Sequence, residues 1–305
     1  MVVYMDMCGD LLHYGHMASM KRARDLGTSL LVGVVSDEGV AAYKAPPVLS
    51  LEERVKLVES VRSVDAVLPG IGTDLDEEFT AALMTRHNVT LVVHGDDPCI
   101  LPSGADAYRF PKNAGIFWAI PRTPGISSTV VVRALLTNTC VPPSTLPLHV
   151  PNWEPRPNTV YVDGAFDGYT VGQVEFLRKA REYGTWLVVG LHSDDVVFAR
   201  RKRRPFFTME DRARCLLACK YVDGVIMDAP TVVTPALLRQ LKASCVARGT
   251  VHETSDRERL RYELVKPKVV TVTSPSDVTM VGLRHRILRH ADLYASKAFN
   301  VSHTA

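Results

Sequence analysis

The chain has 305 residues, of which 46% are hydrophobic and 23% are charged, and its formal net charge is +3. This composition excludes a disordered protein, and the length is sufficient for two domains with separate cores. The small net charge gives no indication of nucleic-acid binding. We interpret the short basic run at residues 200–204 as a solvated loop.

Cysteine spacing and hydropathy argue against a zinc-binding protein, a secreted protein and an integral membrane protein. The six cysteines show none of the paired spacings that form zinc sites. The chain opens without the pattern of a signal peptide, and no apolar run approaches the ~20 residues of a membrane-spanning helix. We therefore expect a cytoplasmic protein with reduced thiols and no integral membrane segment.

Strands and helices are predicted to alternate through the first half of the chain. Apolar runs predict buried strands, Ser50 and Glu53 form a capping box that starts a helix, and Gly27 ends another helix. In chain order we expect strand 1–5, helix 14–26, strand 29–35, helix 51–61, strand 65–68, helix 75–86, strand 89–94, strand 116–120 and helix 127–136. This order indicates a parallel doubly wound sheet, which binds ligands at the carboxyl ends of its strands.

An internal repeat carries the same pattern into the second half. Residues 4–34 recur as residues 161–191, at the offset of 157 positions that separates Tyr4 from Tyr161. A stretch with six prolines between the copies is typical of an extended linker. The sequence thus predicts two tandem Rossmann-like α/β domains from a duplication: residues 1–140, a proline-rich linker 141–158, and residues 159–305. We expect the two domains to pack on each other, and a last helix near 282–298 to close the second sheet.

The tetrapeptide His13-Tyr14-Gly15-His16 stands where the first strand gives way to a helix. A helix N-terminus attracts phosphate through its N–H groups and its dipole, and Gly15 lets the backbone approach a ligand. The two histidines can donate hydrogen bonds to phosphoryl oxygens in a transition state. Taken alone, however, such a tetrapeptide is more often a pair of surface histidines, so a second signal is needed.

The segment Arg122–Thr129 supplies that signal, because it again joins a strand to a helix. Arg122 can bind phosphate with two hydrogen bonds, while Ser127 and Ser128 offer hydroxyl and N–H groups at the helix start. Either turn alone could be an ordinary helix cap. Two anion-binding turns at one edge of a sheet rarely arise by chance, and together they indicate a phosphate site.

Two further segments face the same edge of the predicted sheet. His94-Gly95-Asp96-Asp97 ends a strand, and its carboxylates could hold a ribose, a base amine or Mg²⁺, although an ordinary turn explains it equally well. Lys44 lies on the loop after the second strand. A lysine in such a loop is usually solvated, so its interest comes from the residues around it.

These segments together resemble the signatures of the cytidylyltransferase family, and within it the branch that acts on phosphoethanolamine. The resemblance covers nearly the whole chain, including the duplication. It rests on His13–His16 and Arg122–Ser128, with a lysine loop at Tyr43–Val48 and a nucleotide loop at His94–Asp97. It implies transfer of CMP from CTP to phosphoethanolamine, giving CDP-ethanolamine and pyrophosphate for phosphatidylethanolamine synthesis. It further implies Mg²⁺ bound with CTP, is compatible with a homodimer, and places the protein in the cytoplasm, at most peripheral to the endoplasmic reticulum.

The resemblance also implies a set of active-site residues. His13 and His16 would stabilise the CTP phosphates, Lys44 would hold phosphates of both substrates, and Arg122 would contact the triphosphate. The residues implied to bind CTP are Cys8, Gly9, Asp10, Gly15, His94, Gly95, Asp96, Asp97, Thr123, Gly125, Ile126, Ser127 and Ser128. The resemblance assigns no protein residue as a metal ligand.

The chain departs from the family pattern at two places. The opening Gly-x-aromatic-Asp of the family stands here as Met7-Cys8-Gly9-Asp10, and the second copy replaces the two histidines with Thr170 and Gln173. Because the second copy also lacks the arginine segment, we expect it to be non-catalytic. Two alternatives stay open at this point: a cytidylyltransferase for phosphocholine or glycerol 3-phosphate, and an inactive nucleotide-binding regulatory protein.

Overall fold

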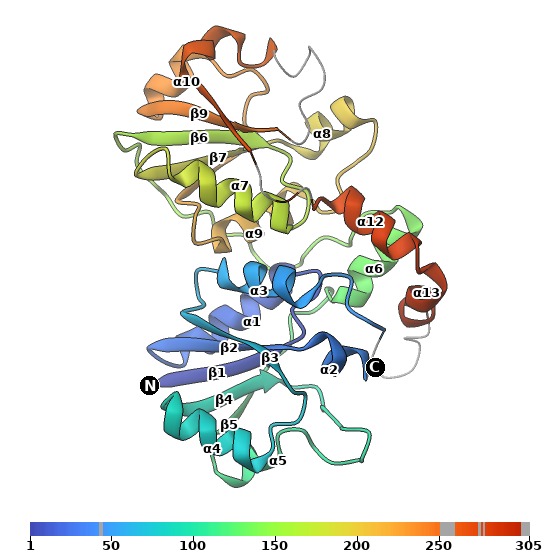
Figure 1. The fold of residues 1–305 in the computed structure, drawn as a ribbon. Helices are drawn as coiled ribbons and strands as arrows, with labels where there is room; N and C mark the ends of the chain where they lie inside the picture. Colours follow the sequence, from blue (N-terminus) through green and yellow to red (C-terminus); the bar gives the residue numbers. More distant parts are fainter. Residues whose placement is uncertain (43–44, 251–259, 274–275, 277, 300–305) are drawn as a thin grey trace. The chain divides into compact units, whose positions relative to one another are not determined.

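The computed structural model describes residues 1–42, 45–250, 260–273, 276 and 278–299. The chain divides into two compact units, which are Met1–Leu136 with Arg286–Ala305, and Thr137–His285 (Figure 1). Each unit contains one parallel sheet with helices between successive strands. The predicted fold class, two tandem Rossmann-like α/β sheets, is therefore confirmed.

The first unit is built on a five-stranded parallel sheet with the order β3-β2-β1-β4-β5. Its strands are β1 (Val2–Met7), β2 (Ser29–Val35), β3 (Ala66–Ile71), β4 (Val89–Gly95) and β5 (Phe117–Ile120). Its helices are α1 (Tyr14–Asp25), α2 (Asp37–Ala41), α3 (Leu51–Glu59), α4 (Glu77–Arg86), α5 (Arg109–Asn113) and α6 (Ser128–Thr137). The apolar runs predicted the strands correctly, whereas the two short helices α2 and α5 have no periodic pattern long enough to predict them.

The second unit repeats this order as β10-β9-β6-β7-β8. Its strands are β6 (Thr159–Gly164), β7 (Trp186–Leu191), β8 (Gly224–Met227), β9 (Ala243–Gly249) and β10 (Val269–Val272). Its helical elements are α7 (Val171–Arg181), α8 (Asp194–Arg201), α9 (Met209–Ala218), α10 (Pro235–Gln240) and the 3₁₀ helix η1 (Glu263–Lys268). The register repeats as well, since Tyr4 pairs with Leu31 in the first sheet and Tyr161 with Val188 in the second.

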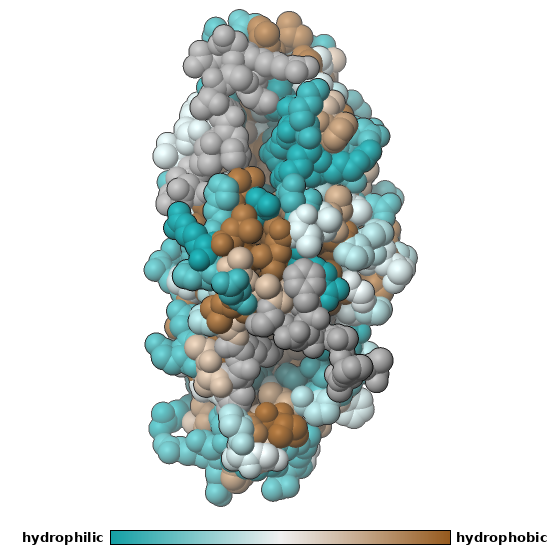
Figure 2. All heavy atoms as spheres, turned by 90° about the vertical axis from the view of Figure 1, so that its right-hand side faces the viewer, coloured by the Kyte–Doolittle hydropathy of each residue, from teal (hydrophilic) through white to brown (hydrophobic). Residues whose placement is uncertain are grey.

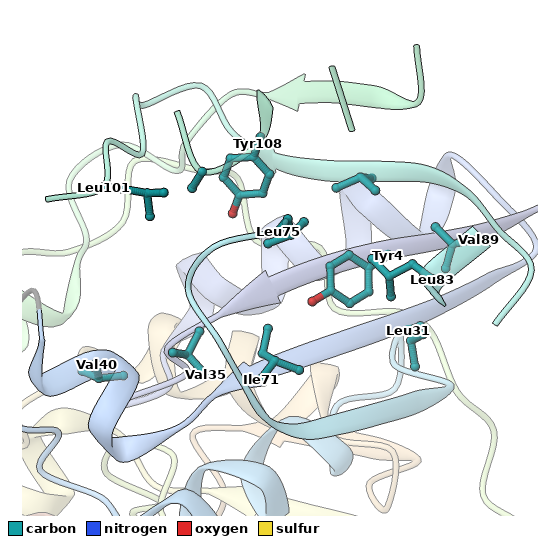
Figure 3. Close-up of a cluster of buried hydrophobic side chains, with 12 residues drawn as sticks. Tyr4, Leu31, Val35, Val40, Ile71, Leu75, Leu83, Val89, Leu101 and Tyr108 are labelled. Carbon is teal, nitrogen blue, oxygen red and sulfur yellow. The ribbon is translucent and has the colours of Figure 1, made fainter. Parts of the chain in front are cut away.

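A buried tyrosine at the centre of each sheet fixes the packing of the neighbouring strand. Tyr4 lies in the apolar cluster shown in Figure 3, among Leu31, Ile71 and Leu83. A Cβ atom at Gly33 would lie 2.3 Å from the Tyr4 hydroxyl, so only glycine fits there. The same arrangement recurs at Tyr161 and Gly190, so the duplication preserved core packing as well as strand order.

The end of the chain differs from the expected single helix closing the second sheet. Two helices follow β10, α12 (Met280–Leu288) and α13 (Ala291–Phe299). The boundary between the units falls inside α12, before Arg286, and α13 belongs to the first unit. In the ranges that the structure describes, no helix is both long and apolar enough to cross a membrane.

Candidate active site

Two histidines cap α1, the helix that follows β1. His13 is the N-cap residue, with an extended backbone (φ −137°, ψ 171°), and its Nδ1 accepts the Gly15 N–H at 3.1 Å. The His13 N–H in turn donates to Nδ1 of His16 at 3.4 Å. Because each Nδ1 is an acceptor, each neutral ring carries its proton on Nε2. The cap therefore selects one tautomer for both rings, with the ring N–H donor at Nε2.

The His13 ring is buried, with only 3% of the residue exposed, and its centroid lies 4.0 Å from that of His16. None of the described residues provides a hydrogen-bond partner for His13 Nε2. Burial, with the nearby His16 and Arg122, lowers the pKa of His13 well below its ordinary value, so the ring is neutral at physiological pH. A buried donor without a partner costs about 1–3 kcal/mol, which a phosphate oxygen would offset.

The segment 122–128 packs directly on this histidine cap. A Cβ atom at Gly15 would lie 2.7 Å from Cγ2 of Ile126 and 3.0 Å from the His13 ring, so glycine is required for the close approach. The Thr123 hydroxyl donates to the Gly15 carbonyl at 3.5 Å. The two turns that the sequence identified as anion-binding are therefore in contact.

The same segment starts α6 at the carboxyl edge of the sheet. Gly125 has a φ of +77°, a conformation that glycine adopts without strain. Ser127 Oγ accepts the Val130 N–H at 3.2 Å, and the Ser128 hydroxyl donates to the Asp10 carbonyl at 3.0 Å. The α6 N-terminus is thereby attached to the chain between β1 and α1. Two helix N-termini with their positive dipole ends thus meet at one place.

The loop after β4 holds Arg122. The Arg122 N–H donates to Oδ1 of Asp96 at 3.2 Å, and its guanidinium pairs with Oδ2 of Asp97 at 3.4 Å. Both side chains of that ion pair are about half exposed, at 56% and 48%. Gly95 accommodates the turn, because a Cβ atom there would lie 2.8 Å from Asp97 Oδ1. A long, exposed ion pair contributes little, so Arg122 can exchange Asp97 for a phosphate at small cost.

The loop Cys8–Asp10 uses its polar groups to brace the chain. Both carboxylate oxygens of the buried Asp10 accept backbone hydrogen bonds, from the N–H of Val48 at 3.0 Å and of Leu49 at 3.1 Å. The Cys8 carbonyl accepts a hydrogen bond from the buried Arg54 guanidinium. A contact of this loop with CTP would therefore come from its backbone rather than from the Asp10 carboxylate.

The second unit shows what the departure at Gly9 changes. Phe166 occupies the corresponding position, and the two residues share a left-handed backbone, with φ values of +69° at Gly9 and +45° at Phe166. Asp167 repeats the contacts of Asp10, accepting the N–H groups of Phe206 at 3.0 Å and Phe207 at 3.1 Å. Glycine at position 9 thus removes a side chain and preserves the loop.

Sequence reasoning missed Asp6 and Tyr108, which lie beside His94. The Tyr108 hydroxyl donates to both carboxylate oxygens of Asp6, at 2.8 and 3.0 Å, and its ring centroid lies 4.5 Å from that of His94. Burial raises the pKa of Asp6, although His94 and the Tyr108 hydroxyl act in the opposite direction. An acidic residue near the end of an apolar strand, repeated as Asp163 in the second copy, was the available signal.

Two expectations remain without a structural test. Lys44 lies outside the described residues, so its expected role stays a prediction. Within the described ranges, no group of three or more His, Cys, Asp or Glu side chains could hold a metal ion. A magnesium ion held mainly by substrate phosphates needs no such group, because it binds to one or two protein carboxylates at most.

The corresponding surface of the second unit is closed by its own chain. Thr170 caps α7 in place of a histidine, and the Gln173 side chain donates to the Asp167 carbonyl at 3.1 Å. A Cβ atom at Gly172 would lie 2.7 Å from the Val278 carbonyl oxygen, so backbone covers the helix start. The polar groups at the start of α7 thus bond within the chain, and the non-catalytic role expected of the second copy stays a prediction.

A buried cluster replaces the Asp6 arrangement in this unit. The carboxylate of Asp163 accepts the Tyr262 hydroxyl at 2.7 Å, lies 3.0 Å from His192 Nε2 and pairs with the Arg261 guanidinium. Burial, reinforced by Arg200 and other nearby arginines, lowers the pKa of His192 to about 4, so this ring is also neutral. Asp163, the counterpart of Asp6, is thus already paired with Arg261 of the same unit.

Known proteins with similar sequences are cytidylyltransferases. The profile of the cytidylyltransferase-like family matches residues 8–134 and 161–297, one match for each copy of the repeat. The ethanolamine-phosphate cytidylyltransferase of Arabidopsis thaliana is 35% identical over 97% of this chain and 82% of its own length. The enzyme of the same name from Dictyostelium discoideum is 34% identical over 81% of this chain and 78% of its own length.

A third relative matches less of the chain. The choline-phosphate cytidylyltransferase A of Mus musculus is 35% identical, but the alignment covers only 44% of this chain and 36% of that protein. Similarity to the ethanolamine-phosphate enzymes, in contrast, extends through both copies of the repeat.

Proposed function

Because this chain belongs to the cytidylyltransferase-like family, we propose that its first unit transfers CMP from CTP to phosphoethanolamine. The reaction yields CDP-ethanolamine, an intermediate of phosphatidylethanolamine synthesis. A phosphate oxygen of phosphoethanolamine forms a bond to the α-phosphorus of CTP, and the bond from that phosphorus to the bridging oxygen breaks. Pyrophosphate leaves with the electron pair of the broken bond.

The observation that carries this proposal is the histidine cap of α1. It combines a buried His13 Nε2 donor that no described residue satisfies with the N-terminus of α1 and with Arg122. Negative charge accumulates on the phosphate oxygens during the displacement, and fixed N–H donors stabilise that charge without reorganising. The protein needs no covalent intermediate, because positioning of the two substrates and charge stabilisation suffice.

We assign the polar residues of the site to separate phosphates and to the metal. His13 and His16 would donate to the α- and β-phosphate oxygens, while Arg122 with Ser127 and Ser128 would hold the rest of the triphosphate. Mg²⁺ would arrive on CTP, with Asp96 or Asp97 as the carboxylates within reach of the phosphate site. When bound, the ion would neutralise charge on the leaving pyrophosphate.

Asp6 supports an acceptor that carries a positive charge. The Asp10 carboxylate is engaged by backbone N–H groups, and Asp96 and Asp97 are assigned above to the metal-bound phosphates, so Asp6 is the carboxylate left for the acceptor. The buried Asp6 carboxylate is held by Tyr108 and can accept an ammonium group at its remaining lone pairs. This favours phosphoethanolamine or phosphocholine over glycerol 3-phosphate.

A panel of substrates tests the proposal. Purified protein should release pyrophosphate only when CTP, Mg²⁺ and an acceptor are all present, with phosphoethanolamine used faster than phosphocholine and glycerol 3-phosphate not used. Equal rates with the first two, or a preference for ATP, would contradict the specific assignment. Binding of CTP without any turnover would favour the alternative of an inactive nucleotide-binding protein.

Two properties accompany the proposed function. We place the enzyme in the cytoplasm, peripheral to the endoplasmic reticulum at most, and the family resemblance is compatible with a homodimer. Fractionation of cells would test the first property, and light scattering of the purified protein would test the second.

A further inference from the structure

A carboxy-terminal segment, defined here as Arg286–Phe299, contacts the first unit at several points. The guanidinium of Arg286 donates to both oxygens of Glu53, at 2.7 and 2.9 Å, and to the Val48 carbonyl at 3.4 Å. Glu53 also accepts the Ser50 N–H at 3.0 Å as part of the capping box of α3. Burial raises the pKa of Glu53, but the hydrogen bonds from Arg286 and Ser50 outweigh it and lower the pKa overall. The carboxylate is therefore ionised, and Arg286 fixes both the start of α3 and the chain before it.

Tyr294 holds the preceding part of the same loop. Its hydroxyl donates to the Pro46 carbonyl at 3.0 Å, and only 5% of the residue is exposed. Burial and the nearby Asp10 carboxylate raise the pKa of Tyr294, so the hydroxyl keeps its proton. Asp10 accepts the N–H groups of Val48 and Leu49 from the other side. The loop 46–49 is thus held between the chain after β1 and the carboxy-terminal segment.

The far end of α13 is attached to α6. The Arg133 side chain donates through Nε to the Ala298 carbonyl at 2.9 Å, and Ala298 is fully buried. Arg133 lies in the helix that starts at Ser128, one of the residues at the phosphate site. Figure 1 shows α13 beside α6 in the first unit. One short helix therefore connects the helix that carries Ser128 with the loop that Asp10 braces.

The opposite face of these helices is exposed. Leu288 and Leu293 expose 38% and 44% of their surface, and Arg289, in the turn between α12 and α13, is also exposed. Figure 2 views the side of the protein that carries α12 and α13, where hydrophobic atoms are visible on the surface. The contacts of Arg286, Tyr294 and Ala298 are thus confined to one face, and the other face supplies control positions.

In the second unit, the linker after the first copy holds the loop that corresponds to 46–49. The Val141 N–H donates to the Phe206 carbonyl at 2.7 Å, and the Ser144 N–H donates to Asp211 at 3.2 Å. Phe206 and Asp211 correspond in the repeat to Val48 and Glu53, which are the contacts of Arg286. The linker thus holds the loop before α9 within the second unit, as Arg286 holds the loop before α3 within the first. The corresponding loop is therefore held in both units, by an arginine side chain in the first and by backbone N–H groups in the second.

From these contacts we infer that Arg286 and Tyr294 are positioning residues for the active site of the first unit. They act on the substrates through the loop 46–49 and Asp10, whose carbonyl accepts the Ser128 hydroxyl at 3.0 Å. The statement that these residues affect catalysis rests on the proposed transfer reaction. The structural part of the inference, that the segment fixes this loop, stands independently of which substrates are used.

Hydrogen exchange of the full-length protein tests the structural part. In Arg286→Gln the amides of Val48 and Leu49 should exchange at least about tenfold faster than in the parent protein, because their hydrogen bonds to Asp10 open more often. The matched control Arg289→Gln removes a cation from the exposed face and should leave both amides unchanged. Equal protection in all three proteins would overturn the inference, whatever the enzyme's substrates prove to be.

Kinetics test the catalytic part. Arg286→Gln should raise the KM for CTP about fivefold to tenfold, because the sides of the phosphate site lose their fixed spacing. A merely structural role would reduce the amount of active enzyme and hence kcat, and it would leave KM unchanged. In Arg286→Lys the KM for CTP should rise less than in Arg286→Gln, because lysine keeps a positive charge near Glu53. Faster exchange with an unchanged KM would overturn the positioning role, whereas absence of turnover in the parent protein would count against the proposed function instead.

If Arg286→Gln does not fold, Tyr294→Phe tests the positioning role instead. It removes one hydroxyl and no buried volume, so the fold should persist. We expect a twofold to fivefold rise in the KM for CTP, with Tyr183→Phe, at an exposed tyrosine of the second unit, as the control without effect. Identical KM values for the two phenylalanine variants would overturn the role of Tyr294.

Discussion

The ring centroids of His13 and His16 lie 4.0 Å apart, and each ring accepts a backbone N–H through Nδ1. A protonated His13 would lose its cap and bring a positive charge next to Arg122. The pKa of His13 is lowered, first by burial and then by His16 and Arg122, so the folded state binds this proton only at low pH. The unfolded chain binds it below a pH of about 6.5.

The stability of the protein should therefore fall as the pH decreases below about 6.5. In that range the unfolded state holds a proton on His13 that the folded state does not, which contributes up to about 1.4 kcal/mol per pH unit. His13→Asn keeps a capping oxygen but does not titrate. Denaturant unfolding between pH 5 and 7 should show a shallower pH dependence in this variant. A pH dependence equal to that of the parent protein would contradict the assignment of a neutral, buried His13.

Removal of one histidine should affect catalysis in one unit only. We expect His16→Ala to lower kcat by at least ~10²-fold, the scale for loss of one donor to a transition state. Gln173→Ala, at the corresponding position of the second unit, should keep kcat within about twofold of the parent. Initial rates of pyrophosphate release measure both variants. A similar loss at the two positions would show that the second unit takes part in the reaction.

Asp6→Asn should impair recognition of the acceptor more than that of the nucleotide. Replacement of the carboxylate removes its attraction for an ammonium group, and we expect the KM for phosphoethanolamine to rise about tenfold. The KM for CTP should stay within about twofold. The asparagine side chain has the same shape and keeps an oxygen that accepts the Tyr108 hydroxyl, so we expect the fold to be unchanged in this variant. An equal rise in both KM values would remove the support for Asp6 as the ammonium partner.

Residues 1–140 expressed alone should be less stable and much less active than the full chain. This fragment lacks Arg286 and Tyr294, so the loop 46–49 loses their hydrogen bonds and keeps those to Asp10. Addition of CTP should raise the melting temperature of the full chain, because the ligand binds only the folded state. Melting curves and specific activities of fragment and full chain give the comparison. A soluble fragment with undiminished stability and turnover would contradict the dependence on the carboxy-terminal segment.

The parts of the fold that follow from local patterns were predictable from the sequence. Buried strands such as Ser29–Val35 are continuous apolar runs, and the capping box at Ser50 marks the start of α3 before any tertiary contact is known. The repeat allowed the second sheet to be predicted from the first. The proximity of His13 to the segment 122–128 followed from the topology of a doubly wound sheet, in which both turns lie at the carboxyl edge.

Other features depend on contacts between residues far apart in the sequence. Asp10 was expected to bind CTP, but its carboxylate is used by Val48 and Leu49, and no local pattern distinguishes the two roles. Tyr108 is recognisable as part of the site only through its hydrogen bonds to Asp6. The final helices carry an ordinary amphipathic pattern that does not reveal which sheet they cover, so α13 was assigned to the wrong unit.

The membership of Arg286–Phe299 in the first unit has a consequence for synthesis of the protein. Domains usually fold in the order in which they leave the ribosome. Here the unit that is made first includes residues that are made after the second unit, so its loop 46–49 stays partly unsupported until translation has passed residue 294. A nascent chain arrested before residue 286 should hold a folded first sheet with a poorly fixed phosphate site, and premature termination there should yield a much less active protein even though every residue of the histidine cap is present.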